Sequence, residues 1–420
     1  MTAKSRVRRA ARLLGAACLA LAATAAAEAT PDRVYELDYE ARLRPQDGVV
    51  DVSLALRQPR DLMRELSFEF DPERYNGFAA DGELEVGADR LTWHPPAAGG
   101  RLSFTLRLDH RRGKGGYDSH MQPDWAVFRA DDLLPPAATR TLKGARSEAR
   151  LRLTGPADWS FISAYERSDE NPEWFLIERS GRRFDRPVGW MAAGRLGVRW
   201  ETIADRKVAI AGPLDHGVRR LDMLAFLHWN LPELVLLYPD FPARLLIVSA
   251  GDPMWRGGLS GPASLFIHAE RPLLSANGTS TLLHELLHVA QGYRAERDED
   301  WIVEGMAEYY TLEIMRRSGT LSAPRQERGL EKLEEWAQAS KGLLGDRSTG
   351  ARTARGVTVM HALDRELRRR SKGRYSLDDV ARALAESGEP VSLQRLRELA
   401  EPLAGGPLKA LSEERLLQKP

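Results

Sequence analysis

The sequence predicts an α+β protein of more than one domain, with strands in the first half and helices in the second. Alternating apolar and polar residues dominate up to about residue 212, whereas apolar residues at helical spacing dominate beyond it. A His-Glu-Leu-Leu-His run, from His284 to His288, lies within one helical stretch. At 420 residues the chain is long enough for two or three hydrophobic cores.

Residues 1–27 have the pattern of a secretory signal peptide. Basic residues between Lys4 and Arg12 precede an alanine-rich apolar run, and Ala25 to Ala27 supply small residues for cleavage. The run is too short to predict a membrane span, and a lipoprotein modified at Cys18, the only cysteine, is an alternative. We therefore expect a periplasmic or secreted protein with no stable membrane span after cleavage.

Residues 30–212 are predicted to form a β-rich N-terminal domain. Alternation is clearest in residues 34–39, 50–56 and 102–108, and glycine-containing turns separate these segments. Many short strands with such turns are typical of a β-sandwich-like domain.

Residues 213–325 are predicted to form a second lobe. A helix is expected from Leu221 to Leu237, with a kink at Pro232, followed by a buried strand at 245–248 and another at 263–267. The histidine helix should begin after Thr279 or Ser280 and stop near Gly292.

A further helix is expected from Trp301 to about Arg317, closed by Gly319. Residues 326–420 are predicted to form a helical C-terminal lobe, in which Ser376 to Asp379 resembles a capping box.

The histidine run predicts a metal site. On a helix, residues four apart share a face, so His284 and His288 can direct two imidazoles at one ion. Glu285 would lie beside water on that ion, which is the arrangement of zinc hydrolases. Fifteen residues separate His288 from Glu304, enough for a loop and a second helix that returns a carboxylate. His284, His288 and Glu304 are thus the predicted ligands of one Zn²⁺ per chain, with a fourth position open for water.

Glu308 lies four residues after Glu304 and should share its helix face. We assign it the hydrogen bond that a metal-bound histidine usually gives to a carboxylate, toward His284 or His288. A solvated helix face is the alternative for both glutamates. Glu285 is predicted to be the general base that accepts a proton from the metal-bound water.

An oxyanion formed during hydrolysis also needs a hydrogen-bond donor. The candidates are Tyr309, Tyr310, His361 and Arg355, although buried tyrosines more often serve in packing. Tyr309 and Tyr310 are included with Glu285 in the predicted catalytic set.

The near balance of charge, 61 basic against 60 acidic residues, gives no reason to expect a nucleic-acid partner. A peptide or protein substrate is expected instead, because the predicted chemistry is attack of water on an amide. The oligomeric state is left open.

At these residues the chain resembles the gluzincin metallopeptidases, and more narrowly the glycyl aminopeptidase family, related to the membrane alanyl aminopeptidases. The resemblance rests on His284 to His288, on Glu304-Gly305 followed by Tyr309-Tyr310, and on Arg355-Gly356 with the run from Glu366 to Leu384. Gly257-Gly258-Leu259 is similar to the family's substrate-edge strand. The resemblance implies a thermolysin-like zincin catalytic domain behind a β-domain, one zinc, and peptide substrates.

Two positions depart from the family's pattern. Thr353 stands where the family places a tyrosine that stabilises the oxyanion, and threonine is too short to replace it directly. Ser260 stands where the family usually has a glutamate directly after Gly-Gly-Leu. This difference puts capture of a substrate's free amino terminus in doubt. The leading hypothesis is a zinc metallopeptidase, and the alternative is a weak or inactive homologue that binds peptides or serves in the envelope. A helix pair without metal is a third hypothesis.

Overall fold

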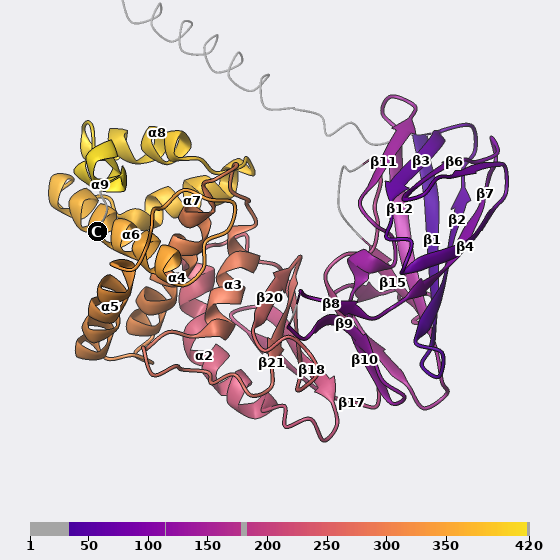
Figure 1. The fold of residues 1–420 in the computed structure, drawn as a ribbon, viewed down its shortest axis with the longest axis horizontal. Coiled ribbons are helices and arrows are strands. Elements are labelled where there is room, and N and C mark those ends of the chain that lie inside the picture. Colours follow the sequence, from indigo (N-terminus) through magenta and orange to yellow (C-terminus); the bar gives the residue numbers. More distant parts are fainter. Residues whose placement is uncertain (1–32, 114, 178–182, 418–420) are drawn as a thin grey trace, which may run out of the picture.

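The computed structural model describes residues 33–113, 115–177 and 183–417, and Figure 1 shows two bodies side by side. The strand-rich N-terminal body lies on the right of the view, and the helices gather on the left. The predicted α+β architecture, with a β domain ahead of a helical part, is confirmed. The predicted signal peptide and Cys18 lie outside the described residues. No helix in the described part of the chain is long and apolar enough to cross a membrane.

A seven-stranded and a four-stranded sheet share one hydrophobic core in the N-terminal body, which is the expected sandwich-like arrangement. Inward residues alternate with outward ones, as in β2(Val49–Arg57), where every second residue is buried. The seven-stranded sheet has the order β14(Glu166–Arg167), β15(Trp174–Ile177), β12(Arg146–Thr154), β1(Val34–Arg44), β2(Val49–Arg57), β7(Gly99–Arg107), β4(Tyr75–Ala80). The smaller sheet has the order β11(Ala137–Thr141), β3(Met63–Glu69), β6(Arg90–His94), β5(Glu83–Val86).

A third sheet lies between the two bodies in Figure 1. Its order is β13(Ser160–Ile162), β16(Trp190–Gly194), β10(Trp125–Arg129), β9(Tyr117–Met121), β8(His110–Arg111). Side chains from β10 and β16, including Trp125 and Trp190, share a core with Leu246 and Phe266 of the next sheet. This shared core fixes the β body against the lobe that carries the histidines.

The fourth sheet has five strands and begins before the expected boundary at residue 213. Its order is β17(Leu196–Ile203), β18(Arg206–Pro213), β19(Arg244–Ala250), β21(Ser264–His268), β20(Gly258–Gly261). The hairpin of β17 and β18 alternates like the preceding strands, so its sequence gives no sign of the change of sheet. The hairpin belongs to the fourth sheet because β18 pairs in parallel with β19.

The helices lie on the side of this sheet that faces away from the N-terminal body in Figure 1. Their bounds are α2(Arg220–Leu237), α3(Thr281–Gln291), α4(Asp300–Arg317), α5(Ala323–Ala337), α6(Ala351–Arg370), α7(Leu377–Ser387), α8(Leu393–Ala404) and α9(Glu413–Leu417). The predicted helix at 221–237 is confirmed as α2, with Pro232 inside it, and the predicted capping box is present at Ser376 and Asp379. One core joins these helices to β18, β19 and β21.

Candidate metal centre

Helix α3 carries the histidine pair and is held in place at both ends and along one face. Ser280 caps its start by accepting a hydrogen bond from the Leu283 amide, and Gly292 ends it in the left-handed conformation, with φ of 64°. The four leucines around the histidines are all buried, which fixes the rotation of the helix. These residues are Leu282, Leu283, Leu286 and Leu287.

Helix α4 brings Glu304 and Glu308 to the same place, and a pair of glycines makes this close approach feasible. A Cβ added to Gly305 would lie 2.8 Å from the Cα of Gly356 on α6, and one added to Gly356 would lie 2.8 Å from the Trp301 carbonyl oxygen. The backbones of α4 and α6 therefore touch beside Glu304. A larger residue at either glycine would push the carboxylate away from its position.

The predicted ligand atoms converge. The Nε2 atoms of His284 and His288 are 3.0 Å apart, and each lies 3.3 Å from a carboxylate oxygen of Glu304. Ligands of a tetrahedral zinc ion at about 2.0–2.1 Å lie about 3.3–3.4 Å from one another. Within the described residues these three form the group that could hold a metal ion. Two imidazole nitrogens and a carboxylate at these distances can coordinate one cation between them.

Glu308 lies behind this group, as expected. Its Oε2 is 2.9 Å from Nδ1 of His284, so the contact is to His284 and not to His288. A proton on Nδ1 leaves the lone pair of Nε2 directed at the ligand cluster.

The charges of the cluster reinforce one another. Burial by itself would lower the pKa of His284, but its contacts with Glu304 and Glu308 outweigh burial and raise that pKa well above the usual range. Burial would likewise raise the pKa of Glu304, yet His284 and His288 hold it far below its ordinary value. The site therefore favours a carboxylate balanced by positive charge, whether from protons or from a metal ion.

Glu285 points toward strand β20, at the edge of the five-stranded sheet. A Cβ on Gly258 would lie 2.5 Å from Cγ and 2.9 Å from Oε1 of Glu285, so a side chain here would displace the Glu285 carboxylate. The Gly-Gly-Leu segment noted in the sequence thus has a physical reason: the strand passes directly over this carboxylate.

A cleft of about 1280 Å³ opens beside the cluster. His284, Glu285, His288 and Glu304 form one part of its wall, and β20, including Ser260, forms another. Arg112 reaches the same cleft from the β body, with its guanidinium 5.6 Å from the Trp255 ring. Both bodies of the molecule therefore contribute to the cleft.

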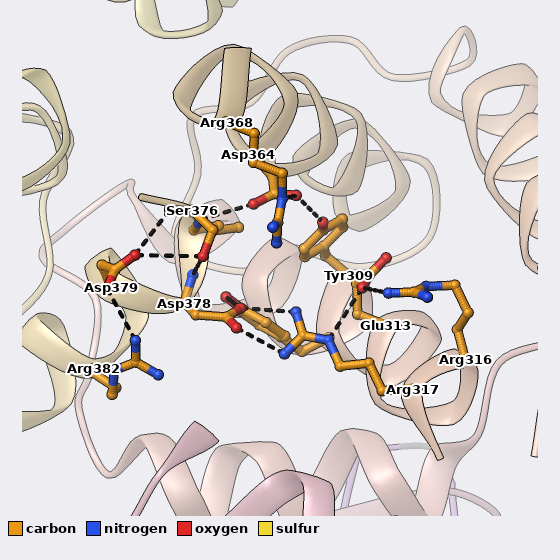
Figure 2. Close-up of polar contacts among 12 residues, drawn as sticks. Tyr309, Glu313, Arg316, Arg317, Asp364, Arg368, Ser376, Asp378, Asp379 and Arg382 are labelled. Carbon is orange, nitrogen blue, oxygen red and sulfur yellow. Dashed lines mark hydrogen bonds and ion pairs between the residues drawn. The ribbon is translucent and has the colours of Figure 1, made fainter. Parts of the chain in front are cut away.

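Tyr309 and Tyr310 were predicted as oxyanion donors, and the structure places them elsewhere. The Tyr309 hydroxyl donates to Asp364 at 3.1 Å and the Tyr310 hydroxyl donates to Asp378 at 2.9 Å. Both side chains are buried, and neither lines the cleft. Figure 2 shows Tyr309 directed at Asp364 within a network of partly buried ion pairs. Residues 309 and 310 follow Glu308 by roughly 100° and 200° of helix rotation, which turns them away from the cluster.

His361 and Arg355 are not oxyanion donors at this cluster either. The His361 ring stacks on Tyr309 with the ring centres 6.3 Å apart, and burial lowers its pKa. Arg355 donates to the carbonyl oxygen of Leu416 at 3.0 Å. Neither residue lines the cleft.

Thr353, by contrast, does lie at the site. It lines a smaller pocket that His284, Glu285, Glu304 and Glu308 also line. Ser348 and Thr349, which the sequence did not single out, line both this pocket and the larger cleft. Ser348 Oγ is buried without a hydrogen-bond partner among the described residues, while its amide donates to Asp300. Ser348 and Thr349 lie in the loop before α6, and no motif marks them in the sequence.

No protein-family model matches the sequence, and no curated protein matches it. Solved structures do match. An aminopeptidase N family protein from Idiomarina loihiensis has a TM-score of 0.62 at 15% identity, covering 88% of this chain and 71% of that one. A mutant M1 zinc metallopeptidase from Deinococcus radiodurans, bound to a Tyr-Ser-Ala substrate, has a TM-score of 0.59 at 15% identity, covering 91% and 93%. Native yeast LTA4 hydrolase has a TM-score of 0.56 at 14% identity, covering 90% and 67%. The chain therefore has the fold of the M1 zinc metallopeptidases, which confirms at the level of fold the resemblance noted in its sequence.

Proposed function

We propose that the protein is a zinc-dependent peptidase, in which His284, His288 and Glu304 bind the metal. The observation that carries this proposal is the convergence of the two imidazole nitrogens and the Glu304 carboxylate at 3.0–3.3 Å. Bound zinc lowers the pKa of a coordinated water toward neutrality and polarises the substrate carbonyl.

In this proposal Glu285 is the general base. It lies one helix position after His284, lines the cleft, and accepts the proton of the attacking water. The same carboxyl then gives that proton to the leaving amine. Glu308 holds His284 in the tautomer that directs Nε2 to the metal.

Strand β20 is the proposed platform for the substrate backbone. It is the edge strand of its sheet and passes over Glu285 with no side chain at Gly258. An extended peptide can add to such an edge through main-chain hydrogen bonds. The Deinococcus enzyme of the same fold was solved with a tripeptide, which supports a peptide substrate here. The leader at residues 1–27 supports action in the periplasm or outside the cell.

Metal content and peptide cleavage, measured on the same preparation, test the proposal. Wild-type protein should hold about one zinc per chain and cleave members of a mixed peptide pool. Glu285→Gln should keep the zinc and lose about 10²–10⁴-fold in kcat. Glu296→Gln, which changes an exposed carboxylate of the same cleft, is the matched control and should keep both. Full activity of Glu285→Gln would disprove its assignment as the base.

A second candidate function is zinc-dependent peptide binding without turnover. The position of Thr353 favours it, because this short side chain lines the pocket beside the cluster. The resemblance noted in the sequence implies an oxyanion-stabilising tyrosine at this position. The burial of Tyr309 and Tyr310 removes the two expected substitutes. Full zinc occupancy with peptide binding, but no cleavage product from the pool, would select this function over the first.

A further inference from the structure

Strand β17 forms the edge of the five-stranded sheet opposite to β20, and it is exposed. Trp200, near its centre, is 53% exposed, although tryptophan is usually largely buried. Exposed sheet edges offer unpaired backbone groups to another strand, and proteins commonly cover or interrupt them. No strand in the described part of the chain pairs with this edge of β17.

The direction of the backbone groups follows from the neighbouring strands. The Lys207 amide donates to Ala243, next to β19, so the odd-numbered residues of β18 face β19 and its even-numbered residues face β17. The register of the hairpin places these even residues opposite the odd-numbered residues of β17. Val198, Trp200 and Thr202 therefore direct their backbone N–H and C=O groups outward.

This edge is complementary to itself. If two copies pair antiparallel about Trp200, then Trp200 lies opposite its counterpart and Val198 lies opposite Thr202 of the other copy. These are the residues whose backbone groups point outward, so each such pair can exchange two hydrogen bonds. The same register sets Arg199 opposite Glu201 of the second copy, and Glu201 opposite Arg199. Opposite charges directly across a strand pair attract, whereas like charges would repel.

Helix α2 adds an apolar flank to this edge. Arg220 Nε donates to the Gly197 carbonyl and His228 Nε2 lies 3.2 Å from Glu201, so α2 runs beside β17. On its other side, Asn230 accepts a hydrogen bond from Ser318 at the end of α4.

The outward face of α2 carries large apolar side chains. Leu221, Trp229 and Leu236 are 66%, 65% and 72% exposed. Leu221 and Trp229 directly follow the residues that contact β17, which places this face next to the strand edge. Pairing of two β17 strands would bring two such faces together beneath the joined sheets, which extends the apolar contact beyond what one strand pair supplies.

We propose that two copies of this chain associate through antiparallel β17 strands to form a symmetric dimer with a continuous ten-stranded sheet. A two-fold axis at Trp200 makes the same patch serve both subunits, as in isologous dimers. The cleft lies beside β20 at the far edge of the sheet and stays open in each copy.

Charge reversal tests this proposal without reference to catalysis. Analytical ultracentrifugation of the full chain should show a dimer whose dissociation constant rises at least about tenfold in Glu201→Arg and in Arg199→Glu. The double variant R199E/E201R restores opposite charges across the pair and should recover dimerisation. Val86→Glu changes an exposed apolar residue on β5 and should leave the dimer intact.

A second variant tests the backbone pairing. Trp200→Pro removes an outward N–H, which an edge strand tolerates, and should yield folded monomer. Circular dichroism and metal content establish folding of each variant. Wild-type protein that remains monomeric at about 100 μM would overturn the proposal, as would a dimer that survives either single reversal. A double variant that stays monomeric would overturn the register. None of these outcomes depends on zinc or on peptide cleavage.

Discussion

Helix α4 carries ionisable side chains on two faces, and the two groups differ in how their charge is balanced. On the cleft face, Glu304 and Glu308 contact His284 and His288, and none of these four is paired with an arginine or lysine within the described residues. On the opposite face, shown in Figure 2, Asp378 pairs with Arg317, and Glu313 pairs with Arg316 and Arg317.

The carboxylates on the cleft face could therefore take up a metal cation, whereas those on the opposite face are already neutralised by arginine side chains. Buried carboxylates are stabilised by paired guanidinium groups, and Arg317 holds the pKa of Asp378 below its ordinary value although burial opposes this. The cleft face has only histidines as positive partners, and an imidazole is a side chain that can also bind a metal ion. Changes on the cleft face should therefore affect metal and activity, and changes on the other face should affect the free energy of unfolding.

Replacing Glu304 should have the largest effect. Glu304→Gln removes the carboxylate ligand, so zinc affinity should fall by more than the roughly 100-fold seen when a partner of a ligand is lost, and activity should disappear with it. Glu313→Gln on the other face is the matched control and should keep the metal. Competition with a zinc chelator measures both. Equal zinc affinity in Glu304→Gln and wild type would contradict the metal site.

On the opposite face of α4, replacing Asp378 should have the largest effect on the free energy of unfolding. Asp378→Asn takes from the partly buried Arg317 its bidentate carboxylate partner and leaves it only Glu313, which should lower the free energy of unfolding by about 1–3 kcal/mol. Urea denaturation measures this loss. The folded fraction should still bind one zinc per chain, and a loss of zinc affinity without loss of stability would show that the two faces are not independent.

A smaller effect is expected from Glu308→Gln. The amide can still contact His284 Nδ1 but no longer supplies charge, so zinc affinity should fall by about 10–100-fold while stability changes little. Isothermal titration with zinc gives the affinity. An unchanged dissociation constant would make Glu308 a packing residue.

The smallest effect should come from Tyr309→Phe. Asp364 keeps Arg368 and the Leu377 amide as partners, so losing the tyrosine hydroxyl should lower the free energy of unfolding by about 1 kcal/mol. The kcat of the proposed peptidase reaction should not change. If Tyr309 were an oxyanion donor, removing its hydroxyl would instead lower kcat by about 10²–10³-fold. Such a loss would return Tyr309 to the predicted catalytic set.

Local signals in the sequence were sufficient for much of this fold. The bounds of α2 and α4 follow within one residue from apolar spacing, and those of α3 follow from its caps at Ser280 and Gly292. The contact of Glu308 with His284 follows from helix geometry. The sheet change at β17 could not be predicted, because a hairpin alternates in the same way whichever sheet it joins. The hydroxyls of Ser348 and Thr349 lie in a loop that only folding brings to the site.

The sequence by itself determined which residues can form a metal centre: the types and spacings of His284, Glu285, His288 and Glu304 suffice to predict one. The tertiary structure decided which neighbours serve that centre. Glu308 and Tyr309 are adjacent in the chain, yet one faces the cluster and the other faces Asp364. The physical reason is that helix spacing fixes the angle between two side chains on α4. The packing of α4 against α6 at Gly305 and Gly356 fixes which face of α4 is turned toward the cleft.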